Sequence, residues 1–282
     1  MENTPIFVSQ TDSLAAINRS EMDIQIATAK AYPRNLTNVL NNILTMATMD
    51  TETAEDCFYV LKRGENSTIE GLSVRMAEII ASAWGNIRVQ TRIIANDGKT
   101  ITAQGICHDL ETNVAVATEV KRSITDRNGR TYSNDMQVVT GNAAAAIAYR
   151  NAVLKVVPKA FTKNVINEVR NVALGKSIDL QTSRQNMLAY YHKIGVTDQQ
   201  IFDYVGVKSI EEIDKESVYI LRATANAIKE GTTTVAETFV AASESKKQAE
   251  KAKEAAETAK EKVAAAKRAQ KASQEEPATK AE

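Results

Sequence analysis

Residues 87–124 have the sequence IRVQTRIIANDGKTITAQGICHDLETNVAVATEVKRSI, which contains three stretches of alternating apolar and polar residues. Side chains of a strand point alternately to its two faces, so we predict strands at residues 87–95, 100–109 and 114–124. Asn-Asp-Gly-Lys at 96–99 favours a hairpin because Asp-Gly tolerates the positive φ angles of tight turns. A second short turn at 111–113 completes a predicted antiparallel meander.

The same alternation predicts where the charged residues of this meander point. In the third strand the valines lie on one face and Lys121 on the other. In the first strand Arg88 and Arg92 share the polar face. We therefore expect these three cations to line one surface of the sheet.

Amphipathic helices are predicted on both sides of the meander. The first covers residues 70–84, with an apolar stripe made by Ile69, Leu72, Met76, Ile79, Ile80 and Ala83. The second follows the loop 126–130 and runs to about Val157, with a core stripe made by Val139, Ala143, Ala146, Ile147, Val153, Leu154 and Val157. Arg150 lies within that stripe, where an arginine is either a paired core charge or a ligand for an anion. The predicted fold class is α+β, followed by a small helical module and a tail.

The pattern of apolar and polar residues along the chain divides it into four predicted segments. Residues 1–34 are predicted to be an N-terminal helical and oligomerisation segment, and residues 35–175 the α+β domain, with a helix at 36–49 and a strand at 57–61. Residues 176–240 carry three capping-box spacings and are predicted to form short helices. Residues 241–282 are almost only Ala, Lys, Glu, Gln and Ser, which indicates a solvated, partly helical tail.

The charge balance conceals a local bias. The chain of 282 residues has 35 basic and 35 acidic residues, but between Leu61 and Arg170 there are fifteen basic against ten acidic ones. This excess favours a polyanionic partner. The two cysteines indicate a reducing compartment, and no apolar run approaches the ~18 residues of a membrane helix. We expect a soluble intracellular protein without a membrane segment.

Motifs for catalysis, metal binding or cofactor binding are missing. His108 and His192 have no cysteine or carboxylate partners at ligand spacing. Gly175-Lys-Ser177 resembles the end of a phosphate-binding loop, but Arg170 occupies the position at which such a loop requires its first glycine. We therefore predict no catalytic residues, no metal site and no cofactor.

Basic residues interleaved with aromatic ones remain as the candidate site. Arginine and lysine neutralise phosphates, and aromatic faces stack on unpaired bases. The basic set is Arg63, Arg75, Arg88, Arg92, Lys121, Arg122, Arg127, Arg130, Arg150, Lys155, Lys159 and Lys163. The stacking candidates are Trp84, Tyr132 and Tyr149. The alternative interpretation is that these basic residues are ordinary solvated cations without a ligand, and that Arg150 forms a buried ion pair.

Several segments of the chain resemble phage and prophage single-strand annealing recombinases of the RecT and lambda Red beta type. These segments are IEGLSVRMAE at 69–78, AWGN at 83–86, HDLETN at 108–113, KRSITDRNGR at 121–130, TGN at 140–142 and RNAVLKVVPK at 150–159. The resemblance covers roughly residues 30–175, and it implies a core of one helix, a three-stranded meander and a long helix.

The resemblance also implies a function. It implies ATP-independent binding of single-stranded DNA, annealing of complementary strands into duplex, and assembly into rings or helical filaments. It implies the cytoplasm of a bacterial host, with a phage exonuclease or a host single-strand-binding protein as partner. The DNA-contacting set that it implies is Arg75, Lys121, Arg122, Arg127, Arg130, Arg150, Lys155 and Lys159.

Two alternatives belong to other functional classes. One is a non-catalytic phage assembly protein with an incidental basic patch. The other is a magnesium-dependent DNA-processing enzyme that uses Glu70, Glu78, Asp109 and Glu111, although these carboxylates show no obvious clustering in the sequence.

Overall fold

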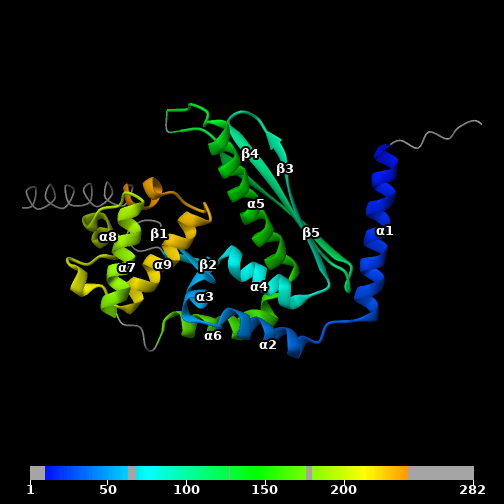
Figure 1. Ribbon diagram of the computed structural model, residues 1–282, viewed down its shortest axis with the longest axis horizontal. Helices are drawn as coiled ribbons and strands as arrows, with labels where there is room; N and C mark the ends of the chain where they lie inside the picture. The colour runs from blue at the N-terminus through cyan, green and yellow to red at the C-terminus, as the bar shows by residue number, and fades with distance from the viewer. Residues whose placement is uncertain (1–9, 63–67, 127, 176–179, 241–282) are drawn as a thin grey trace, which may run out of the picture.

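The structure, a computed structural model, describes residues 10–62, 68–126, 128–175 and 180–240 (Figure 1). The N-terminal part contains α1 (Gln10–Ala31), α2 (Leu36–Ala47), α3 (Thr51–Asp56), β1 (Phe58–Lys62), β2 (Thr68–Leu72) and α4 (Val74–Trp84). The meander β3 (Ile87–Asn96), β4 (Thr100–Asp109) and β5 (Val114–Ser123) leads into α5 (Asn134–Val156) and α6 (Lys159–Ala173). The last part contains α7 (Leu180–Lys193), α8 (Asp198–Val205), η1 (Ile210–Glu212), α9 (Lys215–Lys229) and η2 (Ala236–Val240). The predicted α+β class is confirmed.

The meander forms as predicted. Its strand order is β3-β4-β5, and both pairs are antiparallel. The Asp97 carboxylate closes the first turn by accepting the amides of Lys99 and Thr100 at 3.0 and 2.6 Å. Side-chain acceptors of this kind make Asp a preferred turn residue because they satisfy the turn's own backbone.

Helix α5 lies on one face of this sheet, and a glycine allows it to lie close. A Cβ at Gly105 in β4 would be 2.3 Å from the carbonyl oxygen of Ala148 in α5. The hydroxyl of Thr118 in β5 donates to the same oxygen at 3.0 Å. Alternate residues of β4 are buried beneath α5, so one face of the sheet is covered by the helix.

The structure corrects the prediction for residues 68–73. The sequence favoured a helix from residue 70, but Thr68–Leu72 is a strand that pairs with Phe58–Lys62. The helix begins only after Ser73, whose Oγ accepts the amide of Met76 at 3.2 Å. A cap of this type satisfies one of the free amides at a helix start.

Two main apolar clusters stabilise the described residues. The larger one joins α2, α4, α5, α6 and β1 and contains the buried Trp84, and the smaller one joins α7, α8, α9 and η2. Helix α9 belongs to both, since Tyr219 lies in the larger cluster and Leu221 in the smaller. The side-chain amide of Asn226 also donates to the backbone carbonyl oxygens of Glu55 and Phe58. The helices after residue 180 therefore pack directly on the α+β part.

Helix α1 stands at the edge of the molecule, with the rest of the described chain on one side of it (Figure 1). Among its described side chains only Ala29 is buried, while Met22 and Ile26 are half-buried. The first half of α5 is also less covered than predicted. Val139, which the sequence placed in the core stripe, is exposed because α5 extends beyond the larger core cluster. Within the described ranges no helix is long and apolar enough to cross a membrane.

Candidate nucleic-acid interface

The sheet face opposite α5 carries three of the basic residues. The register places Arg88 opposite His108, Arg92 opposite Gln104 and Lys121 opposite Thr102. All three partners are even-numbered residues of β4, whereas the odd-numbered ones are buried beneath α5. Directly opposed residues share a face, so Arg88, Arg92 and Lys121 lie together on the opposite face, as the alternation predicts. We call these three residues the basic face; Glu119, opposite Gln104, is an acidic residue among them.

More cations lie where the strands end. Lys99 lies in the β3–β4 turn, Arg122 is next to Lys121, and Arg130 lies in the following loop. Two hydrogen bonds of 2.8 Å hold that loop against the turn, from the Ile124 amide to the carbonyl oxygen of Lys99 and from the Thr131 hydroxyl to that of Gly98. Of this group, Arg122 is opposite Ile101 and so shares the α5 side of the sheet.

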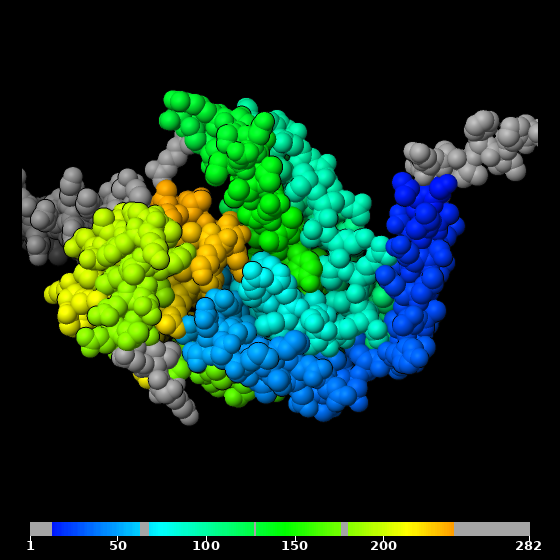
Figure 2. Space-filling model, in the orientation of Figure 1, coloured from blue at the N-terminus to red at the C-terminus, as the bar shows by residue number. Residues whose placement is uncertain are grey.

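Helix α1 stands beside the sheet and reaches it at one end. Gln25 accepts a hydrogen bond of 3.3 Å from Arg88, and a notch opens between α1 and the sheet away from their junction (Figure 2). At the junction lies Tyr32, whose side chain is 76% exposed. An exposed aromatic ring can stack on an unpaired base, while nearby cations hold the phosphates of the same strand. Tyr32 carries no sequence signal for binding, because a tyrosine before Pro33 indicates only a helix end.

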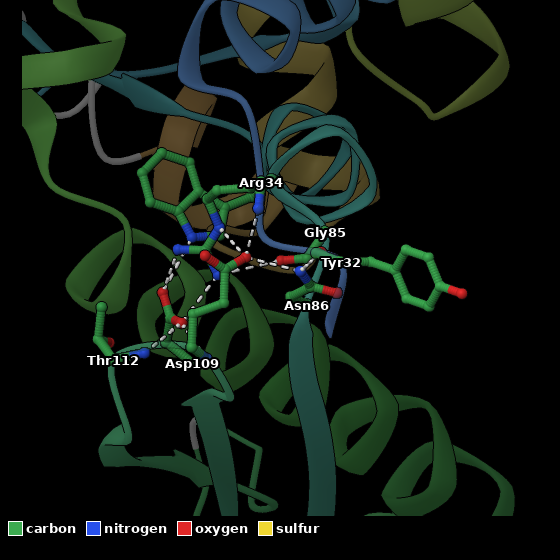
Figure 3. A network of polar contacts seen from close by, with 8 residues as sticks. Tyr32, Arg34, Gly85, Asn86, Asp109 and Thr112 are labelled. Carbon is green, nitrogen blue, oxygen red and sulfur yellow. Dashed lines mark hydrogen bonds and ion pairs between the residues drawn. The ribbon is translucent and has the colours of Figure 1, made fainter. Parts of the chain in front are cut away.

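A polar network fixes the chain next to Tyr32 (Figure 3). The guanidinium of Arg34 pairs with both oxygens of Asp109 and lies 4.6 Å from the ring centroid of Trp84. The amide of Arg34 donates to Glu111 at 2.8 Å, and Asn86 donates to Glu111 and to the carbonyl oxygen of Tyr32. The ring of Tyr32 points away from the network. The network thus joins the α1–α2 link to the end of α4 and to the β4–β5 turn.

Asp109 is the centre of this network. Burial raises the pKa of its carboxyl group, but hydrogen bonds from Arg34, Trp84 and the Thr112 amide outweigh burial and hold the pKa at about 2. The carboxylate is therefore ionised and fully engaged in structural contacts at neutral pH.

Arg150 corrects one expectation. Its guanidinium was predicted to contact DNA, but the residue is only 6% exposed. Its guanidinium carbon lies 4.6 Å from the ring centroid of Tyr59, and Nη1 lies 3.6 Å from Oε2 of Glu230. The other oxygen of Glu230 accepts the Val74 amide at the start of α4 at 2.7 Å. Arg150 is thus the paired core charge of the alternative interpretation, and in this fold it cannot reach a phosphate.

The stacking candidates also need correction. Trp84 is 4% exposed, and its indole nitrogen donates to Asp109 at 3.1 Å, so the prediction that it stacks on a base is wrong. Tyr149 packs against the larger core cluster, and burial raises the pKa of its hydroxyl. Tyr132 is half-buried, and its stacking on DNA stays a prediction.

The other predicted cations are not gathered into one site. Arg75 is exposed on α4 and pairs with Glu78 at 2.8 Å. Lys155 and Lys159 are exposed at the opposite end of α5 from Arg130. Arg127 lies outside the described residues. Of the predicted set, Arg88, Arg92 and Lys121 are therefore the residues that the register brings onto one surface, with Arg122 and Arg130 near the ends of its strands.

No family model, curated protein or solved structure matches this chain. The possible chemistry therefore follows from the side chains themselves. The four carboxylates of the magnesium alternative each pair with an arginine, Glu70 with Arg170, Glu78 with Arg75, and both Asp109 and Glu111 with Arg34. In the part of the chain that the structure describes, no three His, Cys, Asp or Glu side chains lie close enough to hold a metal ion.

Proposed function

We propose that this chain binds single-stranded DNA on the basic face and anneals complementary strands without ATP. The observation that carries the proposal is the alignment of Arg88, Arg92 and Lys121 on the sheet face opposite α5. The resemblance to RecT-type and lambda Red beta annealing proteins supports the same function, and it implies a bacterial cytoplasmic location.

The mechanism requires positioning and no covalent chemistry. Cations hold the phosphates of one strand, while Tyr32 at the junction with α1 offers an aromatic surface to a base. A strand held by its backbone leaves its bases free to pair with a complement. Stacking of about 1.4 kcal/mol for each base-pair step then supplies the free energy of annealing.

The test is a fluorescence-quenching annealing assay with complementary oligonucleotides in EDTA and without nucleotide. The wild-type chain is expected to accelerate annealing over the spontaneous rate. The triple variant Arg88→Gln/Arg92→Gln/Lys121→Gln should lose this acceleration. It should also lower the salt dependence of binding by about 0.7 for each phosphate that it no longer neutralises, about 2 in total.

A matched control removes the same charge elsewhere. The variant Lys155→Gln/Lys159→Gln/Lys163→Gln changes three exposed cations near the junction of α5 and α6. It should keep the wild-type affinity and salt dependence. An equal loss in both variants would show that net charge, and not the basic face, governs binding. Loss in the control alone would move the site to the α5–α6 junction.

Homo-oligomers and an exonuclease or single-strand-binding partner are part of the proposal only through the resemblance. A non-catalytic assembly protein is the second candidate, since α1 exposes several large apolar side chains. The annealing assay separates the two, because an assembly protein would give only the spontaneous rate.

A further inference from the structure

His108 lies on the same side of the sheet as the basic face. It is an even-numbered residue of β4, and the register places it directly opposite Arg88 of β3 and Ala115 of β5. The residues before and after it, Cys107 and Asp109, are buried on the other face. The Cβ atoms of directly opposed residues in antiparallel strands are about 5 Å apart, so the imidazole and the Arg88 guanidinium can contact the same ligand.

One hydrogen bond orients the imidazole of His108. Nε2 lies 2.9 Å from Oδ1 of Asn113 in the β4–β5 turn. An amide oxygen can only accept, so Nε2 donates and carries the proton of the neutral ring. Nδ1 then holds the lone pair, and it has no hydrogen-bond partner among the described residues. A second proton, taken up at Nδ1, gives the ring a positive charge and a free donor without breaking the bond to Asn113.

The charged groups on the β3 and α1 side of His108 are one arginine and one glutamate. Arg88 of β3 is directly opposite, and its Nη1 donates to Gln25 of α1 at 3.3 Å. Glu21 lies one turn before Gln25 on the same side of α1 and is exposed. Glu21 forms no ion pair with His108, whose hydrogen-bond partner is the neutral Asn113.

The β5 side and the turn add two carboxylates, and neither pairs with the ring. Glu119 lies four positions along β5 from the residue opposite His108. Glu111 in the β4–β5 turn is paired with Arg34. Within the described residues the protonated imidazole therefore has no carboxylate partner, and the phosphate of a bound strand suits its charge.

We propose that His108 is a fourth phosphate ligand beside the basic face, that it engages the phosphate in its protonated form, and that it makes DNA binding dependent on pH. This inference rests on the proposed function, because the phosphate belongs to the strand held by Arg88, Arg92 and Lys121. An imidazole changes its charge between about pH 7.5 and about pH 5.5, whereas arginine, lysine and a phosphodiester keep theirs. Binding therefore takes up a proton from solvent and strengthens as pH falls.

Fluorescence anisotropy of labelled oligo(dT) with the full chain, at about pH 7.5, 6.5 and 5.5, tests the proposal. Thymine does not titrate in this range, so the probe itself is unchanged. The wild-type affinity should rise by about three- to tenfold from the highest to the lowest pH. This range lies between the effect of an exposed ion pair and that of a hydrogen bond to a charged group. The salt dependence should steepen at the lowest pH by up to about 0.7, the value for one additional phosphate.

Three variants assign the effect to one ring. His108→Gln should lose the pH dependence. His108→Arg should bind at every pH at least as tightly as the wild-type chain does at about pH 5.5, because a guanidinium does not titrate there. His192→Gln is the matched control and should behave as the wild type. His192 is the only other histidine, pairs with Asp198 at 2.6 Å and lies on α7, at the other end of the molecule from α1 (Figure 1).

Nuclear magnetic resonance of the two imidazoles gives a readout at the ring itself. Selective labelling yields one signal for each histidine, and the His192→Gln variant assigns them. Saturating oligo(dT) should keep His108 protonated to higher pH and leave the titration of His192 unchanged. Equal titration of His108 with and without oligo(dT) would show that its charge is not coupled to the bound strand, and would overturn the proposal.

The binding data separate this proposal from the proposed function. Strong wild-type binding that does not change with pH would refute the role of His108 alone, as would a pH dependence that persists in His108→Gln. A chain that binds no oligo(dT) at any of these pH values would refute the proposed function, and the role of His108 with it.

Discussion

Replacing Arg150 by Gln should mainly destabilise the fold and leave DNA binding unchanged. The variant removes one member of a buried pair, in which the Arg150 side chain is 7% exposed and the Glu230 side chain 13% exposed. Loss of one partner from such a pair typically costs about 3–5 kcal/mol, because a charge is left buried without compensation. The 3.6 Å separation and the absence of a hydrogen bond between the two groups place the expected cost near the lower limit, at about 3 kcal/mol.

The cost should depend on pH through Glu230. Burial raises the pKa of this carboxyl group, and the Val74 amide and the nearby Arg150 charge partly oppose that rise. A carboxyl group whose pKa is higher in the folded state contributes stability that is complete below its unfolded pKa and lost as pH rises through its folded pKa. Removing Arg150 raises the pKa of Glu230 further. The difference in unfolding free energy between wild type and Arg150→Gln should therefore be smaller at about pH 5 than at about pH 7.

Guanidinium chloride unfolding, followed by tryptophan fluorescence, measures this change. Trp84 is the only tryptophan and is buried in the larger core cluster, so its emission reports loss of that core. The midpoint should fall with an unchanged slope, which indicates a loss of stability alone. Arg75→Gln is the matched control, because Arg75 forms an exposed pair with Glu78 and should cost less than about 1 kcal/mol. An Arg150→Gln variant with the wild-type midpoint and weaker DNA binding would refute the buried-pair interpretation.

Three further predictions concern other parts of the structure. Tyr32→Ala should weaken single-strand binding by about 1–3 kcal/mol in a fluorescence anisotropy titration, without lowering the unfolding midpoint, because the ring is exposed. Asp109→Asn should lower the free energy of unfolding by roughly 2 kcal/mol at neutral pH. Because a carboxyl group with a lowered pKa stabilises the fold only in its ionised form, the wild-type chain should lose a similar amount as pH falls from about 4 to about 2. Urea unfolding at each pH measures both changes. Gly105→Ala should lower the thermal midpoint strongly, at a cost of at least about 1–3 kcal/mol, because its methyl group would overlap the Ala148 carbonyl, and an unchanged midpoint would contradict the close packing of α5 on β4.

The elements that the sequence predicted well are those fixed by local signals. The Asn-Asp-Gly-Lys turn at 96–99 and the alternation around it determine the meander, because both act over a few neighbouring residues. Residues 70–72 were misassigned to the helix because Leu72, like Ile69 before it, fits a helical stripe as well as a strand. Pairing with β1 decides their structure, and Gly71 there leaves space for the ring of Tyr59. A contact between separate segments of this kind has no local signature.

In the candidate site, too, local sequence signals gave correct predictions, whereas contacts between distant segments were missed. The common face of Arg88, Arg92 and Lys121 followed from alternation and is confirmed by the register. Whether Arg150 reaches solvent could not be predicted, because its partner Glu230 is 80 positions away in the sequence. Trp84 was misassigned for a similar reason, since Arg34 and Asp109 cover it from two other segments.

The Arg34 network has a mechanical consequence for α1. Helix α1 ends at Ala31, and three residues later Arg34 is held by Asp109 and Glu111. The Tyr32 carbonyl oxygen in this short link also accepts a hydrogen bond from Asn86 of the same network, so the C-terminal end of α1 is attached to the network through two neighbouring residues. One residue inserted into the last turn of α1, between Thr28 and Ala29, would turn the preceding part of the helix by about 100° about its axis relative to the network. The outward Ile17 and Ile24 would then rotate away from their present direction, although neither had been replaced.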